Sequence, residues 1–310
     1  MNILTGPRPG NTYVREVLHL SGLQALLQGA LQGLTEFLPI SSSGHLSIFQ
    51  YFTGLSGESG LLFTVLLHLG TLIAVFIAFW KTILELVVEF FHMLGEIFTG
   101  RFRLSQANPS QRMILLLIVS LLPLCFFILF KDFYASLSSD NDITVEGLCL
   151  IVTGILLTLA DRSRKGRKTA REMRFRDALV IGVAQGIAPL PGVSRSGSTV
   201  AAGMLMGLDR QYAVTFSFIM GIPAVLGANV LELGEALGSG SFELPLVPVL
   251  IGVAAAVVFG IIAIKMVQWV VRTDKFKYFA WYTLTLGSVV TVFGIVELLS
   301  GHAIQRMLLG

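Results

Sequence analysis

The chain has 310 residues, of which 54% are hydrophobic and only 13% are charged, and its formal net charge is +3. Soluble domains usually carry about 25% charged residues, so this composition excludes most soluble folds. Several stretches of about 20 residues carry no formal charge, which at 1.5 Å rise per residue is enough for a helix to cross the roughly 30 Å hydrocarbon layer of a bilayer. The composition predicts an all-α polytopic membrane protein.

The first predicted element is an apolar helix that ends in a polar turn, EFLPISSSGHL, at residues 36–46. Pro39 interrupts the helix. Gln32 and Glu36 are four residues apart and therefore share one face of the helix that enters the turn. Residues 41–44 then open a second short helix, whose free N–H groups and positive dipole end attract phosphate. We expect a broken helical hairpin with an anion-binding tip.

Six later stretches are long and apolar enough to cross a membrane. They are residues 61–80, 113–130, 144–160, 213–231, 246–271 and 278–296. Between the first two lies TILELVVEFFHMLGEIF, residues 82–98, whose polar residues recur at spacings of four, three and four and so share one helical face. We expect this helix to lie along the membrane interface. A seventh crossing with a polar seam inside the bundle is the open alternative.

Basic residues gather in three connections and acidic residues in two others. Residues 81–112, 161–176 and 272–277 together hold 15 Lys and Arg, whereas residues 131–145 and 234–245 hold one basic residue and five acids. Because basic residues accumulate on the cytoplasmic side of short connections, we expect the first three connections to be cytoplasmic and the other two to face outward. The run RSRKGRKTAREMRFR is then a topology anchor, with binding of nucleic acid or anionic lipid as the alternative.

The opening motif recurs when the sequence is shifted by 153 residues. GALQGLTEFLPISSSGH, residues 29–45, lies over GVAQGIAPLPGVSRSGS, residues 182–198, without a gap, and the matching residues are glycines, serines and a glutamine. Copies separated by an odd number of crossings must be inverted relative to each other. We therefore expect one integral membrane domain, residues 1–310, made of inverted repeats 1–160 and 161–310. Two re-entrant hairpins and about six full transmembrane helices would then meet near the midplane.

The second copy carries a cation where the first carries acid and base groups. Its turn holds Ser194, Arg195 and Ser196, with Thr199 just inside the following helix. The guanidinium fork of arginine grips phosphate oxygens in bidentate fashion. A hydrolase needs such a charge stabiliser together with a nucleophile and a proton shuttle, and the two turns contain all three. An ion pair between Glu36 and Arg195 that merely ties the halves together is the structural alternative.

The motifs QGLTEFLPISSSGHL and PGVSRSGST resemble the two signature motifs of the bacterial undecaprenyl-diphosphate phosphatases, membrane enzymes associated with bacitracin resistance. LLHLGTLIAVF and FSFIMGIPAVLGA are also similar to that family, so the resemblance spans nearly the whole chain. It implies hydrolysis of a C55 prenyl diphosphate to its monophosphate, which recycles the lipid carrier for peptidoglycan synthesis. It also implies a bacterial inner-membrane location, a site that opens toward the periplasm, and a divalent cation, Mg²⁺ or Ca²⁺, as cofactor.

Carried over position by position, the resemblance also implies roles for single residues. The family's motifs fall on Gln32, Glu36, Ser41, Ser42, His45, Ser194, Arg195 and Thr199, and neighbouring Ser43 and Ser196 complete the predicted phosphate contacts. We expect Ser42 to attack the terminal phosphorus and His45 to take and return the proton. Arg195 holds the charge, and the cation lies near Glu36 and Gln32. In the competing assignment His45 is the nucleophile and Glu36 the base.

Two other questions stay open at this point. His68, in the 61–80 span, can reach the site or can be an ordinary hydrogen-bonded buried imidazole. A transporter or flippase of a prenyl-phosphate lipid could use the same inverted-repeat site. An ion channel would need a ring of repeated polar residues, which these asymmetric hairpins do not offer. The predicted partners are a prenyl diphosphate lipid and the bilayer, not nucleic acid, and the oligomeric state is not predicted.

Overall fold

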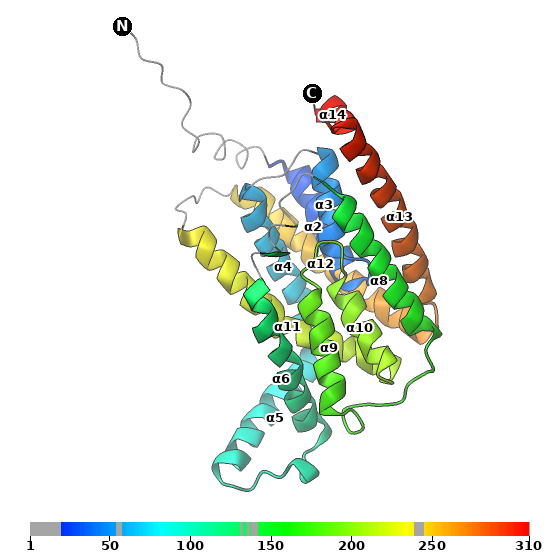
Figure 1. The fold of residues 1–310 in the computed structure, drawn as a ribbon. Helices are drawn as coiled ribbons and strands as arrows, with labels where there is room; N and C mark the ends of the chain where they lie inside the picture. Colours follow the sequence, from blue (N-terminus) through cyan, green and yellow to red (C-terminus); the bar gives the residue numbers. More distant parts are fainter. Residues whose placement is uncertain are drawn as a thin grey trace.

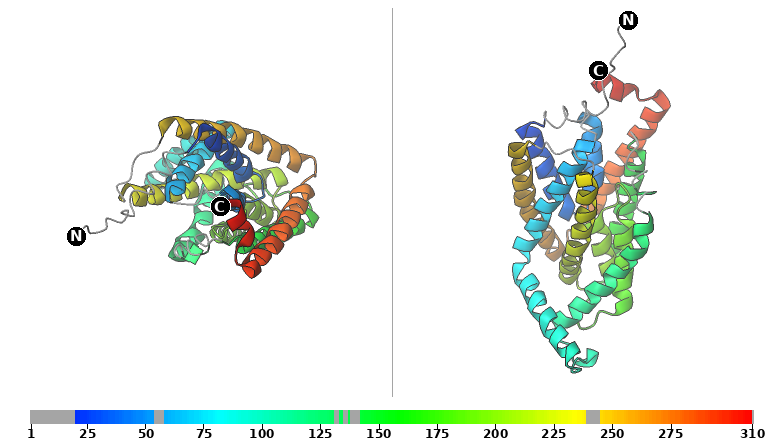
Figure 2. Two further views of the ribbon diagram at one scale, coloured as in Figure 1. Left: turned by 90° about the horizontal axis from the view of Figure 1, so that it is seen from above. Right: turned by 90° about the vertical axis from the view of Figure 1, so that its left-hand side faces the viewer.

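The computed structural model is an elongated bundle of helices (Figures 1 and 2). It describes residues 20–53, 58–130, 133–134, 137, 142–238 and 245–309. No strand forms within these ranges, where an isolated bridge joins Lys168 to Leu208. About half of each outward-facing connection predicted at 131–145 and 234–245 lies outside the described residues.

The described helices follow one another along the chain. In chain order they are α2 (Gly22–Phe37), α3 (Ser42–Thr53), α4 (Glu58–Ala78), α5 (Trp80–Phe98), α6 (Pro109–Phe127), α8 (Thr144–Arg162), α9 (Phe175–Ile187), α10 (Arg195–Leu205), α11 (Arg210–Gly238), α12 (Leu246–Arg272), α13 (Lys277–Ser300) and α14 (Ala303–Leu309). Short 3-10 turns occupy Leu104–Gln106 and Ile128–Phe130.

Five described helices are each long and apolar enough to cross a membrane. They are Pro109–Phe130, Thr144–Arg162, Arg210–Leu231, Leu246–Arg272 and Lys277–Ser300. A sixth candidate is the pair Leu62–Ala78 and Trp80–Phe98, which is bent by 83°. This confirms an all-α multi-pass membrane protein with about six spans. The division into repeats 1–160 and 161–310 stays a prediction.

The amphipathic stretch at residues 82–98 forms α5, which the bend turns away from the axis of α4. Its polar face meets the start of α6. Ser110 donates to Glu85 Oε1 at 2.5 Å, and Asn108 Nδ2 donates to Glu89 Oε2 at 2.8 Å. Carboxylates are favoured there because the N-terminal end of a helix carries positive partial charge. Apolar side chains such as Phe91 cover the other, exposed face of α5. Whether α5 lies in the membrane interface or crosses the bilayer stays a prediction.

The two copies of the repeated motif pack in reciprocal fashion. The chief neighbour of α2 is α12, whereas that of α9 is α6. The matched glycines explain why these contacts are so close. A Cβ on Gly29 would lie 2.1 Å from the oxygen of Gly252, and a Cβ on Gly182 would lie 2.1 Å from the oxygen of Ser120. Helices α2 and α3 lie toward the upper end of the bundle in Figure 1, and α9 and α10 toward the lower end.

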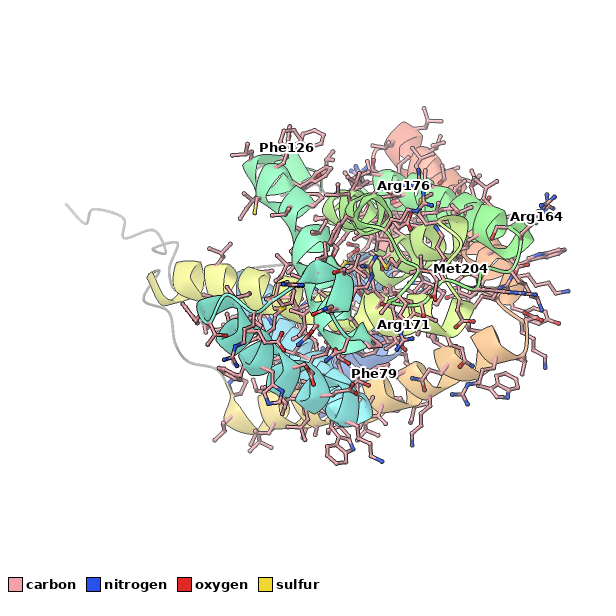
Figure 3. The ribbon with its side chains drawn as sticks, turned by 90° about the horizontal axis from the view of Figure 1, so that it is seen from below. Phe79, Phe126, Arg164, Arg171, Arg176 and Met204 are labelled. Carbon is pink, nitrogen blue, oxygen red and sulfur yellow. The ribbon has the colours of Figure 1, made fainter. Side chains whose placement is uncertain are left out.

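The three basic connections gather at the lower end of the bundle, opposite α14 and the start of α2 (Figure 1). Figure 3 looks onto this end and shows Arg164 and Arg171 in the connection between α8 and α9, and Arg176 at the start of α9. Asp274, between α12 and α13, pairs with Lys165 and lies 3.3 Å from Arg210 Nη1. One end of the bundle is therefore basic, which the charge pattern predicted. Its assignment to the cytoplasm stays a prediction.

Candidate active site

The two turns meet inside the bundle, although they lie far apart in the sequence. The backbone N–H of Gly192 donates to Ser43 Oγ at 3.3 Å, and Ser196 Oγ donates to the oxygen of Leu38 at 3.3 Å. The backbones are in close contact, because a Cβ on Gly44 would lie 3.0 Å from the Cα of Gly192. Each turn therefore carries a serine that holds the other turn.

A serine begins the second helix of each hairpin. Ser41 Oγ accepts the N–H of Gly44 at 3.2 Å, and Ser194 Oγ accepts the N–H of Gly197 at 3.0 Å. These bonds satisfy N–H groups that a helix start otherwise leaves free. Ser41 has φ of 73°, a left-handed backbone that is uncommon outside glycine. The two serines occupy matched positions in the repeat, and in this structure both cap a helix.

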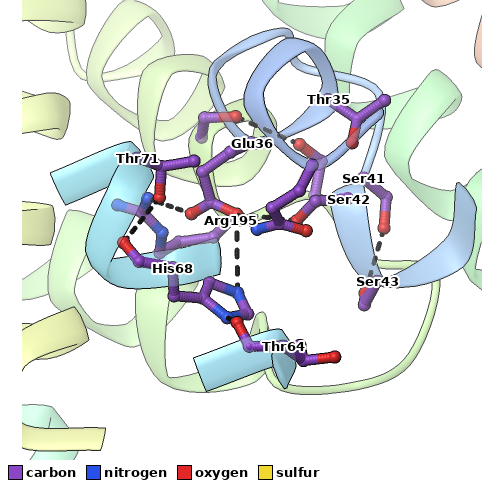
Figure 4. Close-up of polar contacts among 12 residues, drawn as sticks. Thr35, Glu36, Ser41, Ser42, Ser43, Thr64, His68, Thr71 and Arg195 are labelled. Carbon is purple, nitrogen blue, oxygen red and sulfur yellow. Dashed lines mark hydrogen bonds and ion pairs between the residues drawn. The ribbon is translucent and has the colours of Figure 1, made fainter. Parts of the chain in front are cut away.

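Glu36 lies at the centre of the polar cluster in Figure 4, and it is only 7% exposed. Its Oε1 accepts a hydrogen bond from Arg195 Nη2 at 2.6 Å. Its Oε2 accepts from Ser42 Oγ at 2.8 Å and from Gln32 Nε2 at 3.0 Å. A buried carboxylate is tolerated only when it is paired and hydrogen-bonded in this way. The structure thus brings together four residues predicted from the sequence, and they come from both turns.

His45 lies apart from this cluster. Its Nδ1 donates to the oxygen of Ser41 at 2.7 Å, and its Nε2 lies 2.7 Å from the hydroxyl of Tyr282 on α13. Because a carbonyl only accepts, Nδ1 carries the hydrogen, and in a neutral ring Tyr282 therefore donates to Nε2. The two rings also stack, with centroids 5.7 Å apart. Both nitrogens are occupied by groups other than Ser42, so the predicted proton transfer between Ser42 and His45 stays a prediction.

The imidazole beside the carboxylate is instead that of His68. Its Nε2 lies 3.8 Å from Glu36 Oε2, and its Nδ1 donates to the oxygen of Thr64 at 2.9 Å, within α4 (Figure 4). The side chain is 29% exposed, so it lies between the buried carboxylate and the surroundings. The sequence did not decide the role of His68, because an imidazole in an apolar span is expected both for a residue of the site and for an ordinary buried histidine.

Thr199 does not face the cluster either. Its hydroxyl donates to the oxygen of Arg195 at 2.8 Å and forms a short hydrogen bond with Ser217 on α11. Like Ser41, Ser43, Ser194 and Ser196, it stabilises the backbone around the cluster. The phosphate-binding roles predicted for these five hydroxyls stay predictions.

The cluster offers a cation little more than one carboxylate. Both oxygens of Glu36 already accept hydrogen bonds, and Gln32 turns its amide N–H toward them. In the described part of the chain, no group of three or more His, Cys, Asp and Glu side chains could hold a metal. Mg²⁺ commonly keeps several waters and takes one or two carboxylates plus substrate phosphates. The donor set therefore fits a cation that arrives with phosphate ligands, not one held by the protein alone.

These features define a multi-pass helical membrane protein in which two broken hairpins enclose a buried acid, a hydroxyl and a guanidinium. The chain belongs to the family described as Bacitracin resistance protein BacA, whose sequence model matches residues 25–289. The matched region begins within α2, contains both turns and ends within α13. The family resemblance of the two motifs is thereby confirmed.

Similar proteins cover nearly the whole chain. A protein named undecaprenyl-diphosphatase from Alkaliphilus metalliredigens is 37% identical over 278 residues, which is 89% of this chain and 100% of that protein. One of the same name from Carboxydothermus hydrogenoformans is 38% identical over 276 residues, 88% of this chain and 97% of that protein. Undecaprenyl-diphosphatase 4 of Bacillus thuringiensis is 35% identical over 272 residues, 87% of this chain and 96% of that protein.

Proposed function

We propose that this protein is an integral membrane phosphatase that hydrolyses undecaprenyl diphosphate to undecaprenyl phosphate and inorganic phosphate. The observation that carries the proposal is the buried cluster of Glu36, Ser42 and Arg195, which combines a base, a hydroxyl and a cation from two separate turns. The names of the similar proteins supply the substrate.

In this mechanism Ser42 is the nucleophile and Glu36 takes its proton. The Ser42 hydroxyl already donates to Glu36 Oε2 at 2.8 Å, so the base lies within hydrogen-bond reach. As the bond from Ser42 Oγ to the terminal phosphorus forms, the bond from that phosphorus to the bridging oxygen breaks, and undecaprenyl phosphate leaves. Water then attacks the phosphoserine. Phosphate departs, and Ser42 recovers a proton through Glu36.

Arg195 holds the negative charge of the diphosphate. Its Nη2 pairs with Glu36, while its Nη1 is buried and has no hydrogen-bond partner among the described residues. An unpaired buried donor is costly, and a phosphate oxygen would satisfy it. The N-terminal ends of α3 and α10 add free N–H groups and positive partial charge at the same place. The terminal phosphate would therefore lie between the two turns, within reach of Ser42.

We also propose that a divalent cation, Mg²⁺ or Ca²⁺, arrives with the diphosphate. Glu36 and the side-chain oxygen of Gln32 are the protein groups that would hold it, and most of its other ligands would be phosphate oxygens and water. When bound, the cation neutralises charge on the phosphates during the displacement.

The proposed location is the inner membrane of a bacterium, with the site open to the periplasm. The basic end of the bundle would be cytoplasmic, because basic connections stay on that side. The opposite end, where α14 lies, would then be periplasmic (Figure 1). In that setting the enzyme recycles the lipid carrier of cell-wall synthesis and confers resistance to bacitracin.

A transporter or flippase of a prenyl-phosphate lipid is the second candidate. The reciprocal packing of α2 on α12 and of α9 on α6 favours it, because transporters often pair two related halves around a central site. Purified protein in detergent with undecaprenyl diphosphate separates the candidates. The phosphatase releases phosphate over many turnovers and loses this activity in Arg195→Ala. A carrier binds the lipid without turnover.

A further inference from the structure

Helix α11 presents two small residues to the turn that carries Arg195. Ser217 and Gly221 are four residues apart, so they lie on one face of the helix. Both are buried, and Ser217 is 0% exposed. Neither was among the site residues predicted from the sequence.

The guanidinium of Arg195 lies directly against the backbone of α11 at Gly221. A Cβ added to Gly221 would lie 2.0 Å from Nη1 and 3.0 Å from Cζ of Arg195. The Nη1 at this contact is the atom without a partner among the described residues. The absence of a side chain at Gly221 therefore leaves room for the guanidinium to pair with Glu36 through Nη2 and still keep Nη1 free.

Ser217 acts on the same turn through its hydrogen bond with Thr199. The hydroxyl of Thr199 has one hydrogen, which it donates to the backbone oxygens of Arg195 at 2.8 Å and Ser196 at 3.3 Å. The short bond between the two hydroxyls joins Thr199 to Ser217, and Ser217 is its donor as long as Thr199 directs its hydrogen to these backbone oxygens. A relay of hydrogen bonds runs from α11 through Thr199 to the first turn of α10.

We propose that Ser217 and Gly221 form a seat that positions Arg195 for the diphosphate. Ser217 fixes the backbone from which the side chain extends, and Gly221 fixes where its charged end can lie. Both are positioning residues, because they reach the substrate only through Arg195. The inference rests on the proposed function in one respect, that Arg195 binds the diphosphate.

The test measures binding, so it does not depend on turnover. The probe is a prenyl diphosphate analogue whose bridging oxygen is replaced by methylene, titrated into purified protein in detergent. Ser217→Ala should weaken its binding about three- to tenfold, the worth of one hydrogen bond. The matched control is Ser120→Ala, because Ser120 is also 0% exposed and donates within its own helix to Leu117 at 2.7 Å. This control should bind as the wild type does.

A double-mutant cycle separates positioning from a general loss of packing. If Ser217 acts through Thr199, then Ser217→Ala should cost no further affinity in a Thr199→Val background. Gly221→Leu should weaken binding more than about a hundredfold, because the side chain would occupy the place of the guanidinium. Gly227→Leu is its control on the same helix, since a Cβ there meets no described atom within 4 Å.

The outcomes divide clearly. If folded Ser217→Ala and Gly221→Leu bind the analogue with wild-type affinity, these two residues do not position Arg195. This holds even if both variants melt at lower temperature. A wild-type protein that binds the analogue but releases no phosphate from the natural diphosphate overturns the proposed function and leaves the seat intact. A wild-type protein that does not bind the analogue overturns both.

Discussion

Replacing both members of the buried ion pair should distinguish a reaction centre from a structural tie. Glu36 Oε1 and Arg195 Nη2 are 2.6 Å apart, with side chains 7% and 19% exposed. Removing one member of such a pair leaves an uncompensated buried charge, which typically costs about 3–5 kcal/mol, whereas apolar or neutral replacement of both can be nearly neutral. We expect Glu36→Gln and Arg195→Met each to lower the melting temperature, and the double variant to recover much of the loss.

Activity should not follow stability in this series. Each single variant loses an interaction with the reacting groups, so phosphate release should fall about 10²- to 10³-fold or more, and the double variant should be no better. Thermal unfolding and phosphate release are measured on the same purified samples. Glu89→Gln is the control, because Glu89 accepts from Asn108 at the contact between α5 and α6. A double variant that regains activity together with stability would refute the catalytic role and leave the pair as a tie between the turns.

Three further predictions concern the proton shuttle, the cation and the packing of the repeat. With Glu36 as the base, His45→Ala and Tyr282→Phe should both keep most of their phosphate release. Loss in His45→Ala alone would show that His45 carries the proton instead, and equal losses in both would indicate that the stacked pair is structural. A chelator should stop turnover and added Mg²⁺ or Ca²⁺ should restore it. In calorimetry, Mg²⁺ should bind weakly to the protein alone and more tightly with the methylene analogue, because the described site offers one carboxylate. Gly29→Ala should lower the melting temperature strongly, since its Cβ would lie 2.1 Å from a backbone oxygen of α12, whereas Gly95→Ala, with no described atom within 4 Å, should not.

The sequence predicted the spans and the core of the site because both depend on local patterns. Apolar length identifies a helix that crosses the membrane. Glu36 and Gln32 share a helical face, and the repeat placed Arg195 in a turn that matches the one carrying Ser42. Gly29 in the first copy of the motif matches Gly182 in the second for a physical reason, because each glycine permits close contact with a neighbouring helix.

Other features could not be read from the sequence because they depend on contacts between distant segments. The orientation of His45 is set by Tyr282, which lies 237 residues later in the chain. The polar face of α5 was predicted correctly as a pattern, but its neighbour, the start of α6, follows from the bend after α4. The repeated serines predicted anion-binding turns. In the structure the same hydroxyls cap helices and join the two hairpins. A sequence motif alone does not distinguish these structural roles from phosphate binding.

The most direct test of the central claim is a comparison of wild type and Ser42→Ala with undecaprenyl diphosphate. The account predicts that wild type releases phosphate over many turnovers, while Ser42→Ala still binds the methylene analogue with near wild-type affinity and releases no phosphate. Undiminished release by Ser42→Ala, or a wild type that binds the lipid and releases none, would contradict it.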